Sequence, residues 1–257
     1  MSRARTFTLA LLICGCLPTA AQASQTVALH TSFSPNRLGA STTIGFGFTI
    51  ASTTGGLPSP LIHVNLHLPR GMNYVTTTLG LAICKPEALI AKGLSGCSPN
   101  SRLGYGSAYV EVPFGTGSGH EIPNIQALMG PPRNGNIVVL FYADGRAPVY
   151  AQLVFQGELL PGSGPFGGSL DTTIPLIPSV TNGPPVSIIS VNSTIGPRHL
   201  TYYKHVHGRL VGYHPQGVSV PEKCPRGGFP FFADFTFLDG STVPAKSNVP
   251  CPPRRHK

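Results

Sequence analysis

The side chains most capable of chemistry gather in residues 198–214, which contain four of the nine histidines. His205 and His207 are two positions apart, so on a β-strand they would share one face, and paired imidazoles of this kind bind Cu(II) or Zn(II). No acidic residue lies in this segment to orient them, and Lys204 and Arg209 would repel a cation. The pattern therefore favours a solvated basic segment over a metal site.

The same segment contains three tyrosines that are candidates for sugar binding: Tyr202, Tyr203 and Tyr213. Exported β-proteins often stack sugar rings on aromatic faces, since an aromatic ring offers a large apolar surface. The chain has no tryptophan, which weakens this interpretation. Ordinary tyrosines that pack in a core or at a strand edge are the favoured interpretation.

Hydrolytic chemistry finds little support in the sequence. Ser118 and Ser163 lie in glycine-rich stretches, but neither is embedded in the Gly-x-Ser-x-Gly pattern of a nucleophile elbow. Glycosidases usually need two facing carboxylates. The chain has nine acidic residues, and four of them fall in or beside expected strands: Glu111, Glu121, Glu158 and Asp234. Nothing in the sequence pairs them, although any strand acid that faces inward would stand out.

No cofactor is expected. The pairs Gly45 and Gly47, and Gly104 and Gly106, lack the third glycine and the following helix that dinucleotide binding requires. Zinc is disfavoured because no two cysteines are spaced as C-x-x-C.

The first 23 residues have the layout of a secretory signal peptide. Arg3 and Arg5 precede an apolar run at 7–17, and Ala21 and Ala23 are the small residues that a signal peptidase reads, which places cleavage before Ser24. The run is shorter than the roughly 20 apolar residues that a spanning helix needs. An alternative is lipidation at Cys16. The longest later apolar run, 137–143, suits a strand, so no transmembrane segment is expected in the mature chain.

The four cysteines that remain after cleavage form an even set, Cys84, Cys97, Cys224 and Cys251, which predicts disulfides in an exported protein. Three connectivities are possible. We favour Cys84–Cys97 and Cys224–Cys251, because each pair closes a local loop.

Composition favours many short strands. Charged residues make up only 11% of the chain, while 31 glycines and 27 prolines supply turns and 41% hydrophobic residues supply a core. The formal net charge is +9, but the basic residues are scattered apart from the cluster at 254–257. This distribution disfavours nucleic acid as a partner and is more compatible with weak attraction to an anionic cell-wall polymer, polysaccharide or membrane surface, or with a simply solvated tail.

Alternation of apolar and polar residues predicts strands along the whole mature chain. In 61–68, for example, Ile62, Val64, Leu66 and Leu68 alternate with polar residues, so His63 and His67 are expected on the solvated face. The expected strands are 26–32, 42–51, 61–68, 104–112, 122–129, 136–143, 149–159, 170–177, 186–194, 209–213 and 229–238.

One helix is expected at 85–93, because a proline begins the segment, good helix formers follow and a glycine ends it. The predicted fold is therefore an all-β antiparallel sandwich, immunoglobulin-like or larger, with one short helix inside a disulfide loop. The β-region is expected to span 24–243, followed by a loosely ordered basic tail, 244–257, pinned at Cys251. A Pro/Gly-rich stretch at 161–168 is a possible domain boundary, so two small sandwiches remain an alternative.

Four stretches of sequence carry a resemblance: Leu68-Pro69-Arg70-Gly71, Leu79-Gly80-Leu81-Ala82-Ile83-Cys84, the run at 97–108, and Cys224-Pro225-Arg226-Gly227-Gly228-Phe229-Pro230-Phe231. Together they resemble a group of exported β-rich proteins from soil actinobacteria. The group has no assigned activity, so the resemblance implies compartment and class only.

These observations predict an exported, non-enzymatic β-sandwich protein with a structural or binding role in the cell envelope or extracellular space. The alternative is a carbohydrate- or envelope-polymer-binding module, and an extracellular hydrolase comes third.

Overall fold

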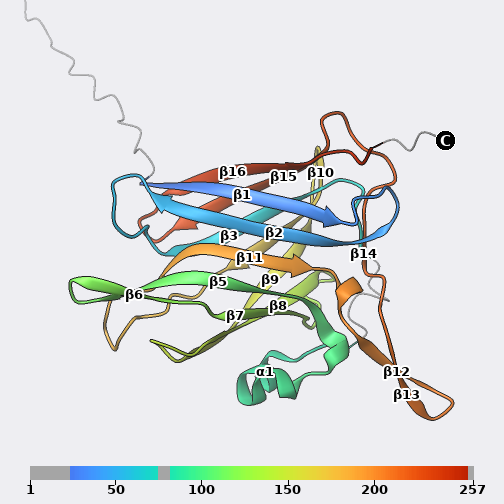
Figure 1. Ribbon diagram of the computed structural model, residues 1–257, viewed down its shortest axis with the longest axis horizontal. Coiled ribbons are helices and arrows are strands. Elements are labelled where there is room, and N and C mark those ends of the chain that lie inside the picture. Colours follow the sequence, from blue (N-terminus) through green and yellow to red (C-terminus); the bar gives the residue numbers. More distant parts are fainter. Residues whose placement is uncertain (1–23, 75–81, 254–257) are drawn as a thin grey trace, which may run out of the picture.

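The computed structural model describes residues 24–74 and 82–253, and most of these residues lie in antiparallel β-strands (Figure 1). The expected all-β class is therefore confirmed. The expected signal peptide at 1–23, its Cys16 and the basic cluster at 254–257 lie outside the described residues.

The strands of the large sheet are β1 (Gln25–Ser34), β2 (Ser41–Ser52), β3 (Leu61–Pro69), β4 (Asn73–Tyr74), β5 (Arg102–Phe114), β6 (Gly117–Glu121), β7 (Asn124–Met129), β8 (Ile137–Gly145), β9 (Ala151–Pro161), β10 (Phe166–Thr173), β11 (Ser187–Ile195), β14 (Val218–Ser219), β15 (Phe229–Phe237) and β16 (Thr242–Val249). A separate hairpin contains β12 (Tyr202–Val206) and β13 (Arg209–Tyr213).

The main strands follow each other in the order β16-β15-β3-β10-β9-β8-β7-β5-β11-β2, and β1 pairs with the free side of β2. This order brings β1 and β16 side by side (Figure 1), where Thr31 Oγ1 donates a hydrogen bond to Ser247 Oγ at 2.9 Å. The sheet is therefore nearly closed and barrel-like. The sheet closes where β1 and β16, the first and last strands of the described chain, lie side by side. We call this contact the β1/β16 seam.

The structure differs here from the expected sandwich. Two packed sheets and one rolled sheet bury the same alternating residues, so the alternation does not distinguish them. The strands also do not divide at 161–168, which contains the turn between β9 and β10 and the adjoining ends of these two strands. Strands from both halves of the chain share the sheet, since β3 pairs with both β10 and β15.

One half of the interior is filled by phenylalanines. β15 directs Phe229, Phe231, Phe235 and Phe237 inward, and each is at most 1% exposed. Their rings meet others from β1 and β2: the ring centroids of Phe33 and Phe229 lie 5.4 Å apart, and those of Phe48 and Phe235 lie 4.9 Å apart. Aromatic contacts of this kind bury large apolar areas and supply much of the stability of this half.

The expected helix is confirmed as α1 (Pro86–Lys92), and the disulfide between Cys84 and Cys97 encloses it. Leu89, which is fully buried, packs with Cys84 against Leu128, Leu140 and Tyr142 on the outer face of β7 and β8. β8 thus has the barrel interior on one face and a covering helix on the other. This double burial explains why residues 137–143 are apolar at every position.

The second disulfide, Cys224–Cys251, also has the expected pairing, with its Cα atoms 5.8 Å apart. Residues 244–249, the first part of the tail that was expected to be loosely ordered, are instead strand, because β16 continues to Val249 and buries Ala245 and Val249. Pro244 is tolerated there since β16 forms a backbone ladder only with β15, and an edge strand can accept a residue without an N–H donor.

Asp239, in the turn between β15 and β16, ties this end of the barrel to the start of β1. Its Oδ2 accepts hydrogen bonds from Ser24 Oγ at 2.6 Å and Gln25 Nε2 at 3.0 Å, and its Oδ1 accepts from Ser241. The hydrogen bond from Ser24, followed by those from Gln25 and Ser241, holds the pKa of Asp239 well below its usual value.

We expect Asp239→Asn to lower the free energy of unfolding by about 1 kcal/mol at pH 7, because it removes the charge that these donors stabilise. The folded state favours the ionised form, so this contribution is complete above the unfolded-state pKa near 4 and declines as the pH falls further. Chemical denaturation at several pH values measures it. Asp234→Asn, on the preceding strand β15, is the control and should change stability little. An unchanged midpoint for Asp239→Asn would contradict the assignment.

Candidate apolar ligand-binding site

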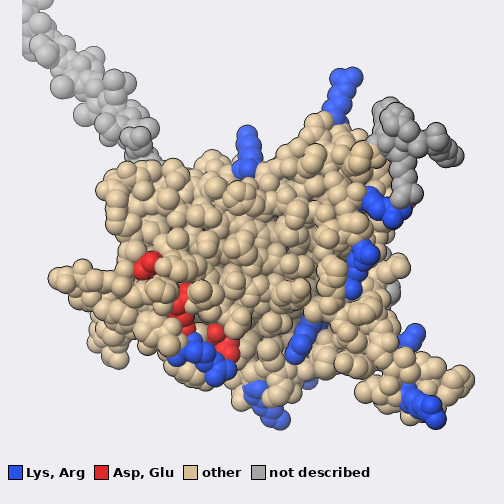
Figure 2. Space-filling model, viewed as in Figure 1, with Lys and Arg blue, Asp and Glu red and all other residues tan. Residues whose placement is uncertain are grey.

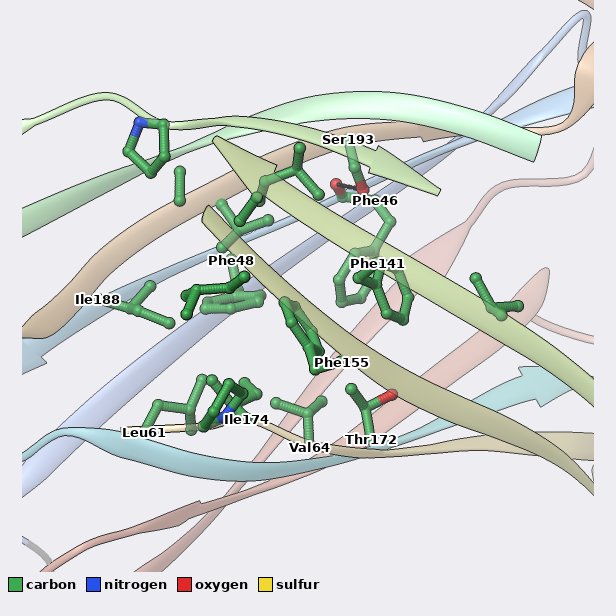
Figure 3. A pocket seen from close by; sticks show the side chains of 18 of the residues that line it. Phe46, Phe48, Leu61, Val64, Phe141, Phe155, Thr172, Ile174, Ile188 and Ser193 are labelled. Carbon is green, nitrogen blue, oxygen red and sulfur yellow. Dashed lines mark hydrogen bonds between the residues drawn. The ribbon is translucent and has the colours of Figure 1, made fainter. Parts of the chain in front are cut away.

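Next to the phenylalanine-filled core, the barrel contains an apolar cavity of about 260 Å³, and Phe48 borders both. Inward-facing residues of β2, β3, β5 and β7 to β11 form its walls (Figure 3). Small residues at several inward positions, among them Ala108, Ala143 and Ala151, leave this space open. The cavity therefore follows from residue size along strands whose register places these positions on the inner face.

Four phenylalanine rings flank the space. Phe46 and Phe48 come from β2, and Phe141 and Phe155 come from the paired strands β8 and β9 (Figure 3). The rings of Phe141 and Phe155 are stacked with centroids 5.2 Å apart, and those of Phe46 and Phe48 meet edge to face at 5.9 Å. Flat apolar surfaces in this arrangement suit an aromatic or alicyclic guest.

Of the described residues that line the cavity, three have polar side chains: Glu121, Thr172 and Ser193. Ser193 Oγ donates a hydrogen bond to the Phe46 carbonyl at 3.0 Å, so the backbone satisfies it. Thr172 is buried on β10, and its hydroxyl lies beside the cavity (Figure 3). The wall therefore offers a guest few polar contacts.

Glu121, at the end of β6, is the carboxylic acid of the cavity wall, and its residue is 8% exposed. Its Oε1 accepts hydrogen bonds from the backbone N–H groups of Arg146 and Ala147, the latter at 3.1 Å. The side chain thereby holds the turn that follows β8. These two bonds use one carboxyl oxygen and leave the other for a hydrogen-bond donor on a guest.

One end of the cavity is lined by residues that are themselves partly exposed to solvent. Residues 174–177 were expected to continue a strand, but β10 ends at Thr173 and these residues line the cavity without forming a strand. The backbone N–H of Ile174 donates to the Ile62 carbonyl and that of Val186 to the Ile177 carbonyl, both at 2.8 Å. Leu176 lines the cavity and is also 45% exposed, so this one side chain borders both the cavity and the solvent.

Further apolar side chains are exposed beside lining residues at this end. Ile122, between the lining residues Glu121 and Pro123, is 62% exposed, and Tyr150, next to Val149, is 67% exposed. They surround the wall segment with apolar surface, which a hydrophobic guest would meet before entering.

His205 and His207, the weak candidates for a metal pair, do not share a face. His205 lies on β12, whereas His207 lies in the following turn with a φ of 47°. Within residues 24–74 and 82–253, no three His, Cys, Asp or Glu side chains are grouped closely enough to hold a metal ion.

The three tyrosines do not form one platform either. Tyr202 is fully buried, and its ring meets that of Tyr213 at 81°. Tyr203 points to the other face of its strand and is 43% exposed. The flat sugar-binding face considered from the sequence is therefore not present at these residues.

The remaining candidate acids are scattered over other surfaces. Glu111 accepts a hydrogen bond from Tyr109 Oη at 3.1 Å, and Glu158 accepts one from Asn136 at 2.8 Å. The sequence did not predict the hydrogen-bonded pair across β3 and β10, in which His63 Nε2 lies 2.6 Å from Asp171 Oδ1. Glu121 is a strand acid that faces inward and stands out for that reason, and strand register is what identifies it.

Comparisons with known proteins add nothing to this geometry: no protein-family model, curated protein or solved structure matches the chain. Among the described residues, no helix is long and apolar enough to cross a membrane.

Thr172 and Thr173 provide a matched test of the cavity, because they are neighbours on β10 that face opposite sides of the sheet. We expect Thr172→Phe to fill part of the cavity and raise the free energy of unfolding by about 1 kcal/mol. Thr173→Phe adds the same ring on the exposed face and should leave stability nearly unchanged. Denaturant unfolding measures both variants. A loss of more than about 2 kcal/mol in Thr172→Phe would indicate overpacking and no usable space.

Proposed function

We propose that this protein is an exported binding protein that holds a small apolar molecule inside its β-barrel. The observation that carries the proposal is the cavity of about 260 Å³, whose wall is apolar except for three side chains. Largely preformed apolar cavities with a few placed polar groups are the usual form of small-molecule sites. This refines the binding role expected from the sequence by giving it a location and a ligand class.

Packing energetics support an occupant. Cavities in protein cores cost about 24 cal/mol per Å³, so an empty cavity of this volume would forgo about 6 kcal/mol. That is comparable with the whole net stability of many domains. A guest that restores the missing contacts would recover much of this energy, and a dry apolar cavity admits apolar guests more readily than water.

The volume also limits the size of the guest. An engineered cavity of about 150 Å³ holds benzene, so the space here suits about ten non-hydrogen atoms, which is the size of a bicyclic aromatic or a terpene-like alcohol. Long-chain lipids would need more room than these walls enclose.

Export is supported by the two disulfides, since such bonds persist in oxidising compartments. The proposed cleavage before Ser24 would make Ser24 the first residue of the mature chain, and Ser24 is already engaged with Asp239. We also propose that the protein belongs to the group of exported actinobacterial proteins and acts near the cell envelope.

The two alternative functions receive less support. The three tyrosines considered for sugar binding do not form one platform, and the described cavity wall holds a single carboxyl group, whereas a hydrolase of the two-carboxylate type needs a pair.

The decisive experiment is thermal unfolding with and without 2-naphthol, a probe with a bicyclic apolar ring system. At a free concentration of 100 times Kd, a ligand that binds only the folded state stabilises it by about 2.7 kcal/mol, which corresponds to about 5–10 °C in a chain of this size. We expect a shift of this order for the wild type and for Thr173→Phe, and little shift for Thr172→Phe. Equal shifts in all three proteins would place binding outside the cavity and contradict the proposal.

The polar end of the guest should depend on Glu121. 2-Methylnaphthalene has the shape of 2-naphthol but replaces the hydroxyl donor with a methyl group. Glu121→Gln keeps one acceptor for the Arg146 and Ala147 N–H groups and replaces the other oxygen with a donor. We expect the ratio of affinities for 2-naphthol over 2-methylnaphthalene to fall about five- to tenfold in Glu121→Gln, as measured by calorimetry. An unchanged ratio would remove Glu121 from ligand recognition and leave the apolar site intact.

A further inference from the structure

The β12–β13 hairpin stands apart from the barrel. Its strands pair with each other and form a separate two-stranded sheet that extends away from the barrel body (Figure 1). His207 and Gly208 connect them with φ values of 47° and 76°, which is the left-handed geometry of a tight two-residue hairpin turn. The tip therefore has the backbone conformation of a regular hairpin turn.

Contacts at the base hold the hairpin in this direction. Tyr202 is fully buried, and its Oη donates a hydrogen bond to the Arg102 carbonyl. The side chain of Asn100 bonds both backbone groups of Tyr203: Nδ2 donates to the carbonyl and Oδ1 accepts from the N–H, each at 2.7 Å. The projection is thus built into the fold by buried and paired groups at one end only.

Beyond this base, the hairpin exposes apolar side chains on both of its faces. Val206 and Val211 share one face and are 38% and 41% exposed, while Leu210 lies on the other face and is 61% exposed. Side chains on both faces of a lone hairpin cannot all pack against the barrel. Their exposure costs solubility, so an environment that surrounds the tip is the simplest explanation for them.

The charge of the hairpin is entirely positive. Residues 198–214 contain Arg198, Lys204 and Arg209 and no acidic residue. In the view of Figure 2, the hairpin at the lower right displays blue side chains and no red ones, while the visible acidic residues lie on the opposite side of the molecule. Lys204 Nζ lies 5.1 Å from the centre of the Tyr213 ring, close to the apolar residues.

From these features we propose that the β12–β13 hairpin is an anchor that inserts its tip into the surface of an anionic lipid membrane. Val206, Leu210 and Val211 enter the boundary between headgroups and acyl chains, and Lys204 and Arg209 contact the phosphates. Charge alone would suit an anionic polymer equally, but a hydrated polymer offers nothing to the exposed leucine and valines. This proposal does not depend on the ligand in the cavity.

Sedimentation of the mature full-length chain with lipid vesicles tests the anchor. We expect binding to vesicles of phosphatidylcholine with about one third phosphatidylglycerol, weaker binding at high salt, and much weaker binding to phosphatidylcholine alone. The double variant K204Q/R209Q should lose about 10- to 30-fold in affinity for the anionic vesicles. The double variant L210S/V211S should lose a similar amount without changing charge.

Ile90→Ser is the matched control, because Ile90 is 69% exposed on α1 at another surface and should be irrelevant to the membrane. Circular dichroism and thermal unfolding establish that each variant is folded. No binding of the wild type to anionic vesicles would overturn the proposal. Binding that survives L210S/V211S, or that is matched by a soluble anionic polysaccharide, would identify a polymer-binding surface instead. Self-association that disappears in L210S/V211S would identify a contact between copies of this chain.

Discussion

The β1/β16 seam is the constraint on which the rest of the structure depends. In the described chain these strands meet through side chains and not through a backbone ladder: Thr31 bonds Ser247, Asn36 bonds the Pro250 carbonyl, and Ser24 and Gln25 bond Asp239. Each bond joins residues more than 200 positions apart. An open sheet of this length would expose its apolar inner face and two strand edges, so these few bonds convert an open sheet into an enclosure.

Closure has different consequences in the two halves of the interior. Phenylalanines from β1 and β15 pack densely on one side of the interior, and Phe48 of β2 lies between them and the cavity. In the other half, alanines at inward positions of β5, β8 and β9 leave space that the aromatic rings of β8 and β9 border without filling. A well-packed half makes it possible to keep the opposite half open without losing the fold.

Much of the fold was predictable from local patterns. The alternation in β3 predicted the inner and outer faces of residues 63–68, although Leu61 and not Ile62 continues the inner face. The proline and glycine around α1 predicted the helix, the even cysteine count predicted disulfides, and the short loops favoured the observed pairing. These features depend on residues close in sequence. The predicted end of the strand 170–177 was wrong. Ile174 and Leu176 have the spacing of strand residues, but β10 ends at Thr173 and both side chains line the cavity.

The closed sheet and the cavity could not be predicted, because both depend on which strands become neighbours. Glu121 illustrates the difficulty. Its sequence position suggests an ordinary strand end, and only its pairing with Val110 across β5 and β6 places it at the cavity wall. The small side chains of Ala143 and Ala151 indicate a cavity only when β8 and β9 are known to face β2 and β3 across the barrel. Register, and not composition, therefore decides where the candidate site lies.

The cavity wall and the hairpin lie at opposite ends of one strand, and this arrangement connects the two features. β11 begins at Ser187, just after Val186 fixes the wall segment 174–177, and it ends at Ile195, shortly before the hairpin. A barrel held at a surface by its β12–β13 tip would therefore turn Leu176 and its exposed apolar neighbours away from that surface. In this orientation a guest would enter from the surrounding solution, which is consistent with the small size of the cavity, since a molecule of about ten non-hydrogen atoms dissolves and diffuses far more readily than a lipid.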